Sequence, residues 1–307
     1  MLSLSLILVM LFMTCSNSVY AISSEIASVA EESRENEVSK ASTGNNEIKL
    51  QTVSSRYVGS FTKTYVYLNG KALNIDARII NGVTYVATRA FFESATSMKV
   101  SYNSSKRTLS VNGGGLSLEV TDNSHIVYAN GRVLFTMTPS VIMSNGRMYT
   151  PLSSIAKSVG LSVGKNGANI TLSGKITPLM SADKFYREDA VYWLSRIISA
   201  ESRGEPVHGQ IAVGNVVMNR VDSNQFPNTI WGVIFDKKYG VQFSPIIDGS
   251  IYKTPTSSSV LAAKICLEGF SISEKTLFFL APRYATSSWI PNSRTYEFTI
   301  ANHDFYS

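Results

Sequence analysis

Residues that bind metals or form disulfides are scarce in this chain of 307 residues, which has two cysteines and three histidines. The histidines lack the spacing of an HExxH zinc site and the cysteines form no CxxC motif, so zinc amidases and zinc peptidases are disfavoured. No glycine-rich phosphate-binding motif occurs either. We therefore predict that the protein uses no metal and no cofactor.

The chain also lacks a long apolar run at its N-terminus. Residues 2–13 are apolar, but this run is shorter than the ~20 residues that span a bilayer. Because Val19-Tyr20-Ala21 fits a signal-peptidase site, we predict a signal peptide over residues 1–21 and a secreted protein. An uncleaved anchor and a lipoprotein modified at Cys15 are the alternatives. Cleavage would leave Cys266 as the single thiol, which excludes an intramolecular disulfide.

Charged residues make up only 16% of the chain and are unevenly distributed. Residues 22–50 are polar with no aromatic residue, which predicts a disordered linker. Residues 51–175 contain 13 lysines and arginines against 4 acidic residues, whereas residues 176–307 contain 12 of each. A basic exported module favours anionic wall polymers as partners, the alternative being that the cations only keep the module soluble. Nucleic acid is not a predicted partner.

An internal duplication lies within residues 51–175. Asn81-Gly82, followed by Tyr85, recurs as Asn145-Gly146, followed by Tyr149, at an offset of 64 residues. Thr108-Leu109-Ser110 recurs as residues 171–173. Each copy is predicted to form a hairpin with an Asn-Gly turn, a short helix (residues 88–97 and 152–159) and a returning strand pair. The stretch YVYLNGKALNIDARIINGVTYVATRAFFE resembles the N-terminal stalk-like domain of copper amine oxidases, which implies a spacer or attachment module. It implies no copper here, because the region contains one histidine, His125.

A glutamate, Glu201, falls on the apolar side of a predicted helix. The apolar positions Val191, Leu194, Ile197 and Ile198 have helical spacing, and Glu201 continues their stripe. Burial disfavours the charged form of a carboxyl and raises its pKa toward the range of a general acid. The alternative is a salt bridge at the helix end. Because Gly204-Glu205-Pro206 then stops the helix and a second helix follows, Glu201 is predicted to lie at a corner between two helices.

The same segment carries a family resemblance. SAESRGEPVHGQIAVGNVVMNR, from Ser199, resembles the signature of bacterial cell wall hydrolases of the spore-cortex-lytic type, and FPNTIWGVIF, QFSPIIDG, LFFLAP, SSWIP and NHDFY follow in order. The resemblance implies a mainly α, lysozyme-like or lytic-transglycosylase-like catalytic domain over residues 180–307. It also implies cleavage between N-acetylmuramic acid and N-acetylglucosamine, with Glu201 as the acid. The whole chain is then a multidomain α+β protein, a β-rich tandem stalk followed by this catalytic domain.

The resemblance favours a scheme with a single general acid/base. Glu201 would protonate the glycosidic oxygen, and the muramoyl C6 hydroxyl would attack C1 and leave a 1,6-anhydro end. A two-carboxylate muramidase, with Asp248 or Glu205 as second acid, is an alternative, and Glu205 could instead be structural. A non-catalytic wall-binding or spore-coat protein is the alternative from another class.

Substrate contacts are predicted from the side-chain chemistry that a glycan groove needs. Flat apolar faces suit sugar rings, and amides or hydroxyls suit their polar edges. The candidates are Gln242, Phe243, Ser244 and Trp289, each of which could equally belong to the core, and Glu205. The predicted partners are peptidoglycan glycan strands, anionic wall polymers through the basic stalk, and a regulatory partner protein. The predicted location is the cell envelope or the spore cortex.

Overall fold

The computed structural model describes residues 50, 60–143, 145–238, 240–285 and 287–307. The predicted signal peptide, Cys15 and almost all of the predicted linker lie outside these residues. The chain divides into two compact units with the boundary between Arg187 and Glu188. Every helix that the structure describes is too short or too polar to cross a membrane.

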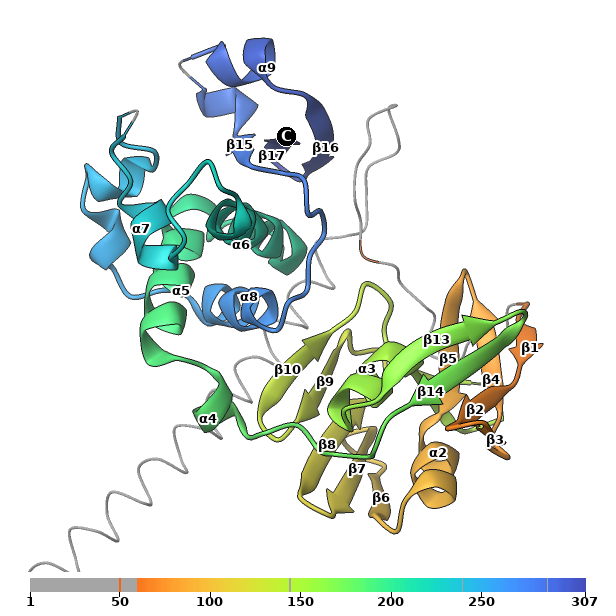
Figure 1. The fold of residues 1–307 in the computed structure, drawn as a ribbon. Coiled ribbons are helices and arrows are strands. Elements are labelled where there is room, and N and C mark those ends of the chain that lie inside the picture. The colour runs from red at the N-terminus through yellow and green to blue at the C-terminus, as the bar shows by residue number, and fades with distance from the viewer. Residues whose placement is uncertain (1–49, 51–59, 144, 239, 286) are drawn as a thin grey trace, which may run out of the picture. The chain divides into compact units, whose positions relative to one another are not determined.

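The N-terminal unit, residues 60–187, is built mainly from strands, as predicted (Figure 1). Its first sheet has the order β1-β4-β5-β12-β11, its second β10-β9-β8-β7-β6 and its third β13-β14-β2-β3. The strands are β1 (Thr62–Thr64), β2 (Val66–Leu68), β3 (Lys71–Ala72), β4 (Ala77–Ile80), β5 (Val83–Ala87), β6 (Lys99–Asn103), β7 (Thr108–Gly113), β8 (Leu116–Thr121), β9 (Ile126–Ala129), β10 (Arg132–Phe135), β11 (Val141–Ile142), β12 (Met148–Pro151), β13 (Ser162–Asn166) and β14 (Asn169–Ser173). The helices are α2 (Thr88–Ala95), α3 (Leu152–Ser158) and α4 (Ala182–Phe185).

The duplication gives this unit a local two-fold relation. Strand β5 pairs antiparallel with its own repeat, β12, so that Tyr85 lies opposite Pro151, Val86 opposite Thr150 and Ala87 opposite Tyr149. The two equivalent tyrosines are buried and each reaches the other copy. The Tyr85 hydroxyl donates to the Pro139 carbonyl (3.0 Å), and the Tyr149 hydroxyl donates to Asp76 (2.6 Å). The repeats are therefore one folding unit with a shared core.

The structure shows a further pair of repeated hairpins that we did not predict from the sequence. VYLNGKAL, from Val66, forms the β2-β3 hairpin, and VYANGRVL, from Val127, forms the β9-β10 hairpin. Both turns are Asn-Gly with positive φ at both residues, 50° and 83° at Asn69-Gly70 and 51° and 76° at Asn130-Gly131. These values are the type I′ conformation, which Asn and Gly adopt more readily than other residues.

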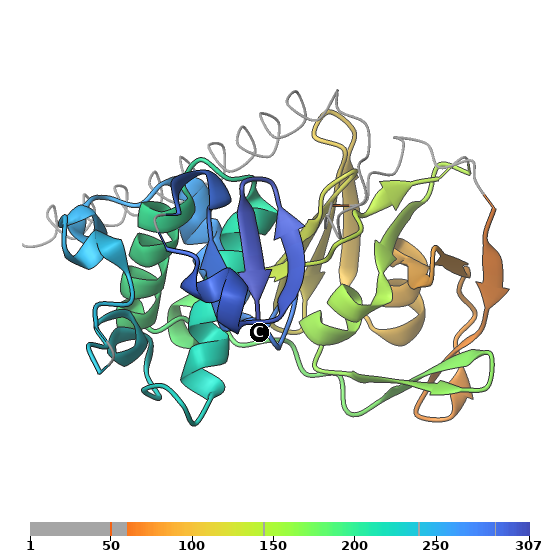
Figure 2. The ribbon, with the colours of Figure 1, turned by 90° about the horizontal axis from the view of Figure 1, so that it is seen from above.

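The C-terminal unit, residues 188–307, consists of helices and one small sheet. The α-helices are α5 (Glu188–Ser202), α6 (Val207–Asp222), α7 (Ile230–Ile234), α8 (Ser257–Leu267) and α9 (Trp289–Ser293). Three short 3-10 helices are η1 (Ser244–Ile246), η2 (Ser250–Tyr252) and η3 (Pro282–Tyr284). The strands β15 (Phe278–Leu280), β16 (Tyr296–Ile300) and β17 (His303–Tyr306) form a sheet of order β15-β17-β16. Figures 1 and 2 show this sheet beside α6.

Small residues allow the three long helices of this unit to pack closely. Helices α5, α6 and α8 pack against one another. Gly214 of α6 leaves no room for a side chain, because a Cβ there would lie 2.6 Å from the Cys266 sulfur and 2.8 Å from Ile198. On its other side α6 packs Ala212, Val213 and Val216 against strands β16 and β17. Gly214 thus allows α6 to approach α5 and α8 closely, and this packing holds the end of α5 against its neighbours.

Candidate active site

Glu201 is the penultimate residue of α5 and faces inward. Leu194, Ile197 and Ile198 of the same stripe are fully buried, as the helical spacing predicts. The chain turns at residues 203–206, and α6 begins at Val207. Gln210 of α6 fastens this turn by donating its amide to the Glu205 carbonyl (2.9 Å). Glu201 therefore lies at a corner between two helices whose geometry is held by packing and hydrogen bonds.

The surroundings of Glu201 favour its protonated form. Burial raises the pKa of this carboxyl to about 7, and the charge of Asp248 adds to the rise, while His303 and Arg220 oppose it. No described residue makes a hydrogen bond to the carboxyl group that would stabilise its anion. A carboxylic acid with a pKa near neutrality can give a proton to a leaving group and take one back. Glu201 has the properties of a general acid/base.

Glu205, four residues later, is held in the opposite protonation state. Its side chain is buried and accepts two hydrogen bonds from Asn302, one from the backbone N–H (3.1 Å) and one from the side-chain amide (3.0 Å). The His303 Nδ1 atom lies 3.6 Å from Oε1. Burial pushes the pKa of Glu205 up, but the contacts with His303 and Asn302 outweigh it and hold the pKa below its usual value. Neighbouring carboxyls with pKa values driven apart indicate an acid and a charged partner.

Arg220 is a buried cation of this site that the sequence did not reveal. Its guanidinium lies 4.9 Å from the centre of the Phe226 ring, 5.2 Å from that of Phe243 and 5.3 Å from that of Phe278. Its Nε donates to the Leu277 carbonyl (2.7 Å). Burial lowers its pKa to about 10, opposed by the charges of Asp236 and Glu201. Arg220 therefore stays charged at neutral pH and supplies positive potential near the acid.

The predicted substrate residues from QFSPIIDG occupy different environments. Phe243 is only 2% exposed, between Arg220 and Phe279, so its ring is part of the core and offers no open face to a sugar. The sequence left both a sugar contact and a core position open for Phe243, because it does not show which side of the loop is covered. Ser244 and Asp248 are exposed, and Gln242 is half-buried. These residues can still meet a ligand.

Trp289 and Glu205 complete the predicted set. Trp289 is 53% exposed at the start of α9, with its ring 5.9 Å from that of Phe278 and 5.0 Å from the Arg294 guanidinium. It has an accessible face and remains a predicted contact. Both carboxylate oxygens of Glu205 are taken up by Asn302. Glu205 thus braces the β16-β17 turn against the start of α6, and its role toward substrate also remains a prediction.

In the part of the chain that the structure describes, the other candidate nucleophiles and metal ligands form no further catalytic site. Cys266 is buried, its pKa is raised by burial, and its thiol donates to the Ile211 carbonyl (3.4 Å), so it is unsuited to nucleophilic attack. Residues 160–164, GLSVG, have the letters of a GxSxG motif, but Ser162 lies in the hairpin strand β13 and not at a strand-to-helix elbow. Within the described residues, no three His, Cys, Asp or Glu side chains gather as metal ligands.

Comparison with known protein families agrees with the division of the chain into two units. Residues 204–306 match the cell wall hydrolase family, and residues 67–173 match the copper amine oxidase N-terminal domain. The chain therefore contains a region similar to cell wall hydrolase domains and a region similar to copper amine oxidase N-terminal domains. Glu201 lies three residues before the first residue of the hydrolase match.

Among the curated relatives are spore cortex-lytic enzymes. That of Bacillus cereus is 38% identical over 105 residues, which are 34% of this chain and 39% of the relative. That of Bacillus subtilis (strain 168) is 38% identical over 97 residues, 32% of this chain and 31% of the relative. The chain thus spans less than half the length of these relatives. Among solved structures, the catalytic domain of the germination-specific lytic transglycosylase SleB from Bacillus anthracis is 36% identical, covering 40% of this chain and 97% of that one, with a TM-score of 0.37.

Proposed function

We propose that this protein is an exported peptidoglycan-lytic enzyme that cleaves the bond between N-acetylmuramic acid and N-acetylglucosamine, with Glu201 as its general acid/base. The observation that carries the proposal is the inward-facing carboxyl of Glu201 at the corner of α5 and α6, with its pKa raised to about 7. The family match and the cortex-lytic relatives support a cell wall substrate. Spore cortex is the proposed wall, because the curated relatives are named for it.

The proposed reaction needs one carboxyl group. Glu201 gives its proton to the glycosidic oxygen as the bond to C1 breaks. The C6 hydroxyl of the same muramoyl residue attacks C1, and the Glu201 carboxylate takes up the hydroxyl proton. The products are a 1,6-anhydromuramoyl end and a free hydroxyl on the leaving sugar, and Glu201 is again protonated. Glu205 is the less suitable second carboxylate, because its oxygens already accept hydrogen bonds from Asn302.

A two-carboxylate muramidase is the second candidate. Asp248 is exposed, and its charge acts on Glu201. It could assist water in a hydrolytic reaction. The two schemes yield different ends, since transglycosylation leaves 1,6-anhydromuramic acid and hydrolysis leaves reducing muramic acid. A non-catalytic wall-binding protein would leave neither.

The N-terminal unit is proposed to attach the enzyme to the wall. Its excess of lysines and arginines, 13 against 4 acidic residues over residues 51–175, would attract anionic wall polymers. This part of the proposal predicts binding to isolated wall that weakens as salt is raised. Export through the predicted signal peptide and a regulatory partner protein belong to the same proposal.

Mass spectrometry of the released muropeptides tests the function. Purified cortex and vegetative wall are each treated with the protein, with Glu201→Gln and with Asp248→Asn. We expect 1,6-anhydromuramic ends from the protein and from Asp248→Asn, and none from Glu201→Gln. Reducing ends that disappear in Asp248→Asn would establish the muramidase instead. No release from either wall, with wall binding retained, would favour the binding protein.

A further inference from the structure

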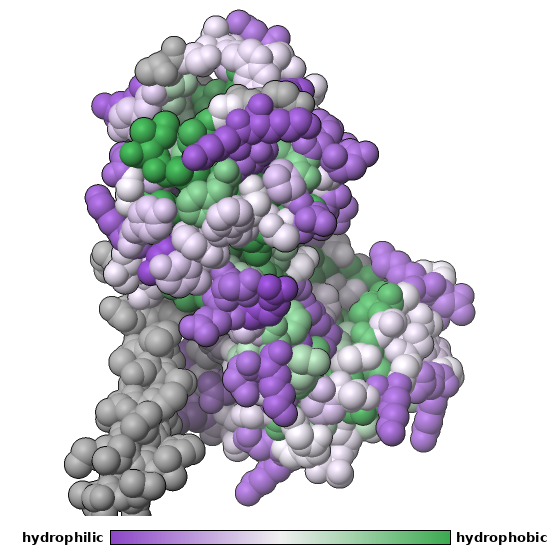
Figure 3. All heavy atoms as spheres, turned by 60° about the vertical axis from the view of Figure 1, so that its left-hand side comes forward, coloured by the Kyte–Doolittle hydropathy of each residue, from purple (hydrophilic) through white to green (hydrophobic). Residues whose placement is uncertain are grey.

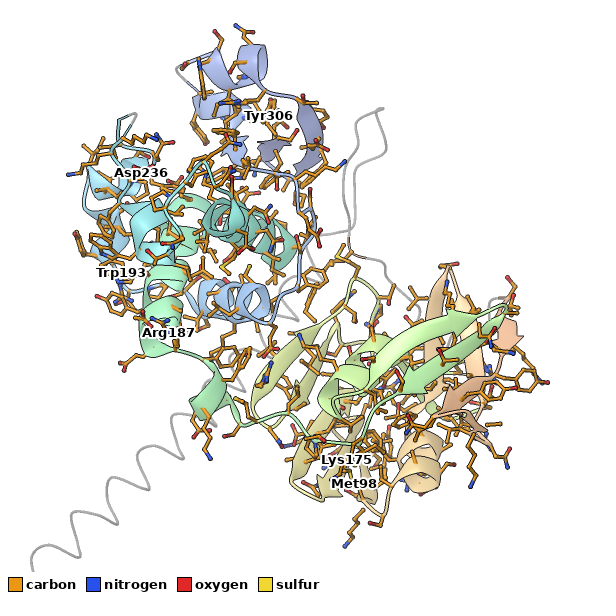
Figure 4. The ribbon with its side chains drawn as sticks, in the orientation of Figure 1. Met98, Lys175, Arg187, Trp193, Asp236 and Tyr306 are labelled. Atoms are coloured by element: carbon orange, nitrogen blue, oxygen red, sulfur yellow. The ribbon has the colours of Figure 1, made fainter. Side chains whose placement is uncertain are left out.

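Five aromatic residues of the C-terminal unit form one continuous surface cluster outside the surroundings of Glu201. Ring centres lie 4.9 Å apart for Tyr192 and Trp193, 5.1 Å for Trp193 and Phe235, 5.1 Å for Trp231 and Phe235, and 6.4 Å for Trp193 and Tyr252. We call this cluster the aromatic surface. Tyr252 is 61% exposed, Trp231 56% and Tyr192 42%. Figure 4 marks Trp193 on α5, and Figure 3 shows pale and green atoms among hydrophilic ones on the side that carries α5 and α7.

The aromatic surface is held rigid from beneath. Trp193 and Phe235 are half-buried and meet edge to face, at an interplanar angle of 88°. Trp231 stacks on Phe235 at 30°. The Thr229 hydroxyl caps α7 by accepting from the Gly232 N–H (3.0 Å). A preformed surface binds a ligand without the entropic cost of ordering its side chains.

Two connections tie the aromatic surface to the acid. Trp193, Ile197 and Glu201 are spaced by four residues, so they lie along one side of α5. At 1.5 Å per residue, the eight residues from Trp193 to Glu201 extend about 12 Å along the helix. The loop that contains Asp248, whose charge acts on Glu201, continues directly into η2 with Tyr252. A polymer bound at Glu201 could therefore extend over these rings.

The chemistry of the surface fits sugars of an anionic glycan. Exposed indole and phenol rings offer flat apolar faces with polar edges, which match the faces and hydroxyls of a pyranose. Cations flank the rings. The Arg196 guanidinium lies 3.6 Å from the centre of the Tyr192 ring, and the exposed Lys253 follows Tyr252. They complement the lactyl carboxylates of muramic acid residues that carry no peptide.

We propose that the aromatic surface is a second carbohydrate-binding site, which holds sugar rings of the same glycan strand away from the bond being cleaved. This inference rests on the proposed function and adds a preference for long strands. It predicts that loss of the rings raises KM for long strands and leaves kcat unchanged, while short muropeptides are cleaved as before.

Binding is tested in the full chain with the Glu201→Gln substitution, so that cleavage plays no part. The probe is peptide-free glycan strands from purified wall, compared with the disaccharide of the same sugars. We expect Trp231→Ala and Tyr252→Ala each to weaken strand binding about fivefold, the order expected for one aromatic contact, with no change for the disaccharide. Trp231→Phe should recover part of the binding. Tyr284→Ala is the matched control, an exposed tyrosine (75%) of the same unit outside the cluster, and should bind as the parent does.

The outcomes separate this inference from the proposed function. If the unsubstituted protein cleaves wall but Trp231→Ala and Tyr252→Ala bind strands as tightly as the parent, the carbohydrate site is wrong and the function stands. If strands bind less tightly to the variants while no preparation is cleaved, the carbohydrate site stands and the catalytic proposal fails. If the unsubstituted protein dimerises in solution and Trp231→Ala abolishes the dimer with strand binding intact, the aromatic surface joins two copies of the chain and the inference is overturned. Tryptophan fluorescence melting of each variant checks that the unit remains folded.

Discussion

The two units of this protein use charged residues in different ways. In the N-terminal unit two partly buried carboxylates have arginine partners, Asp76 with Arg78 (2.7 Å) and Asp122 with Arg107. In the C-terminal unit Glu201 is mostly enclosed without a hydrogen-bonding partner among the described residues, and Arg220 is buried among three rings. Burying an ionisable group costs stability, and groups whose pKa values are strongly shifted by burial cluster at functional sites. This difference indicates that the charges of the N-terminal unit serve its packing, whereas those of the C-terminal unit serve chemistry.

The largest effect is expected from Glu201→Gln. Glutamine keeps the shape of the side chain but cannot donate the proton, so we expect release of muropeptides to fall by about 10²- to 10⁴-fold or more. Tryptophan fluorescence reports on the C-terminal unit, because Trp193, Trp231 and Trp289 are the three tryptophans of the chain. It should show an unchanged fold. Glu188→Gln, at the exposed start of the same helix, is the matched control. Equal activity in both variants would remove Glu201 from the mechanism.

The stability of the C-terminal unit should depend on pH through the titration of Glu201. The pKa of Glu201 rises from 4.5 to about 7 on folding, so its contribution to stability is complete below pH 4.5 and is lost as pH rises through about 7. At pH 8 the C-terminal unit should be destabilised relative to Glu201→Gln by up to about 3 kcal/mol, and at pH 4 by almost nothing. Urea unfolding followed by tryptophan fluorescence measures the difference. Equal stability of the two proteins at both pH values would contradict the raised pKa.

The pH dependence of the catalytic activity should also follow the titration of Glu201. Because the reaction needs protonated Glu201, kcat/KM should fall about tenfold per pH unit above pH 7. Asp248 raises the pKa of Glu201, so Asp248→Asn should move this decline to lower pH. A decline that stays at the same pH in Asp248→Asn would mean that another group titrates.

A smaller effect is expected from Glu205→Gln, which tests the charged brace between α6 and the β16-β17 turn. Loss of the charge should cost about 1–3 kcal/mol, because a buried hydrogen bond to an ionised group is replaced by a neutral one. The pKa of Glu205 is lowered by folding, so this contribution is present above pH 4.5 and is lost as pH falls. A double-mutant cycle with Asn302→Ala measures the coupling. Additive effects of the two substitutions would show that the contact between Glu205 and Asn302 contributes no coupling free energy.

Effects on stability of similar or smaller size are expected in the shared core of the two repeats. Tyr149→Phe removes a hydrogen bond to the carboxylate of Asp76, whereas Tyr85→Phe removes one to a backbone carbonyl. Bonds to charged groups contribute more, so we expect a loss of about 1.5–3 kcal/mol for Tyr149→Phe and about 0.5–1.5 kcal/mol for Tyr85→Phe. Circular dichroism of the strand-rich unit reports the change. Tryptophan fluorescence melting of the C-terminal unit should stay the same, and a shift there would show that the units unfold together.

Local patterns account for the parts that could be predicted from the sequence. Helical spacing placed Glu201 on the inner side of α5, and the Gly-Glu-Pro turn ended the helix at Ser202. The repeat offset anticipated the equivalent helices α2 and α3. The VYLNGKAL and VYANGRVL hairpins carry a sequence repeat of the same kind.

Contacts between distant segments could not be predicted. The sequence left Phe243 open between a sugar contact and the core, and the structure covers it with Arg220 of α6 and Phe279 of β15. Glu205 meets Asn302 across 97 residues of sequence. No periodicity encodes either pairing, because each depends on how whole elements pack.

The amino-acid sequence by itself therefore determined the order of a basic, repeated strand module and a helical unit with an inward-facing acid, since spacing and composition act over a few residues. Tertiary structure alone decided that the pKa values of Glu201 and Glu205 shift in opposite directions, because a pKa also depends on charges and hydrogen bonds brought in from α6, β17 and the loop at Asp248. It also assembled the aromatic surface from α5, α7 and η2, whose rings are up to 60 residues apart in the chain.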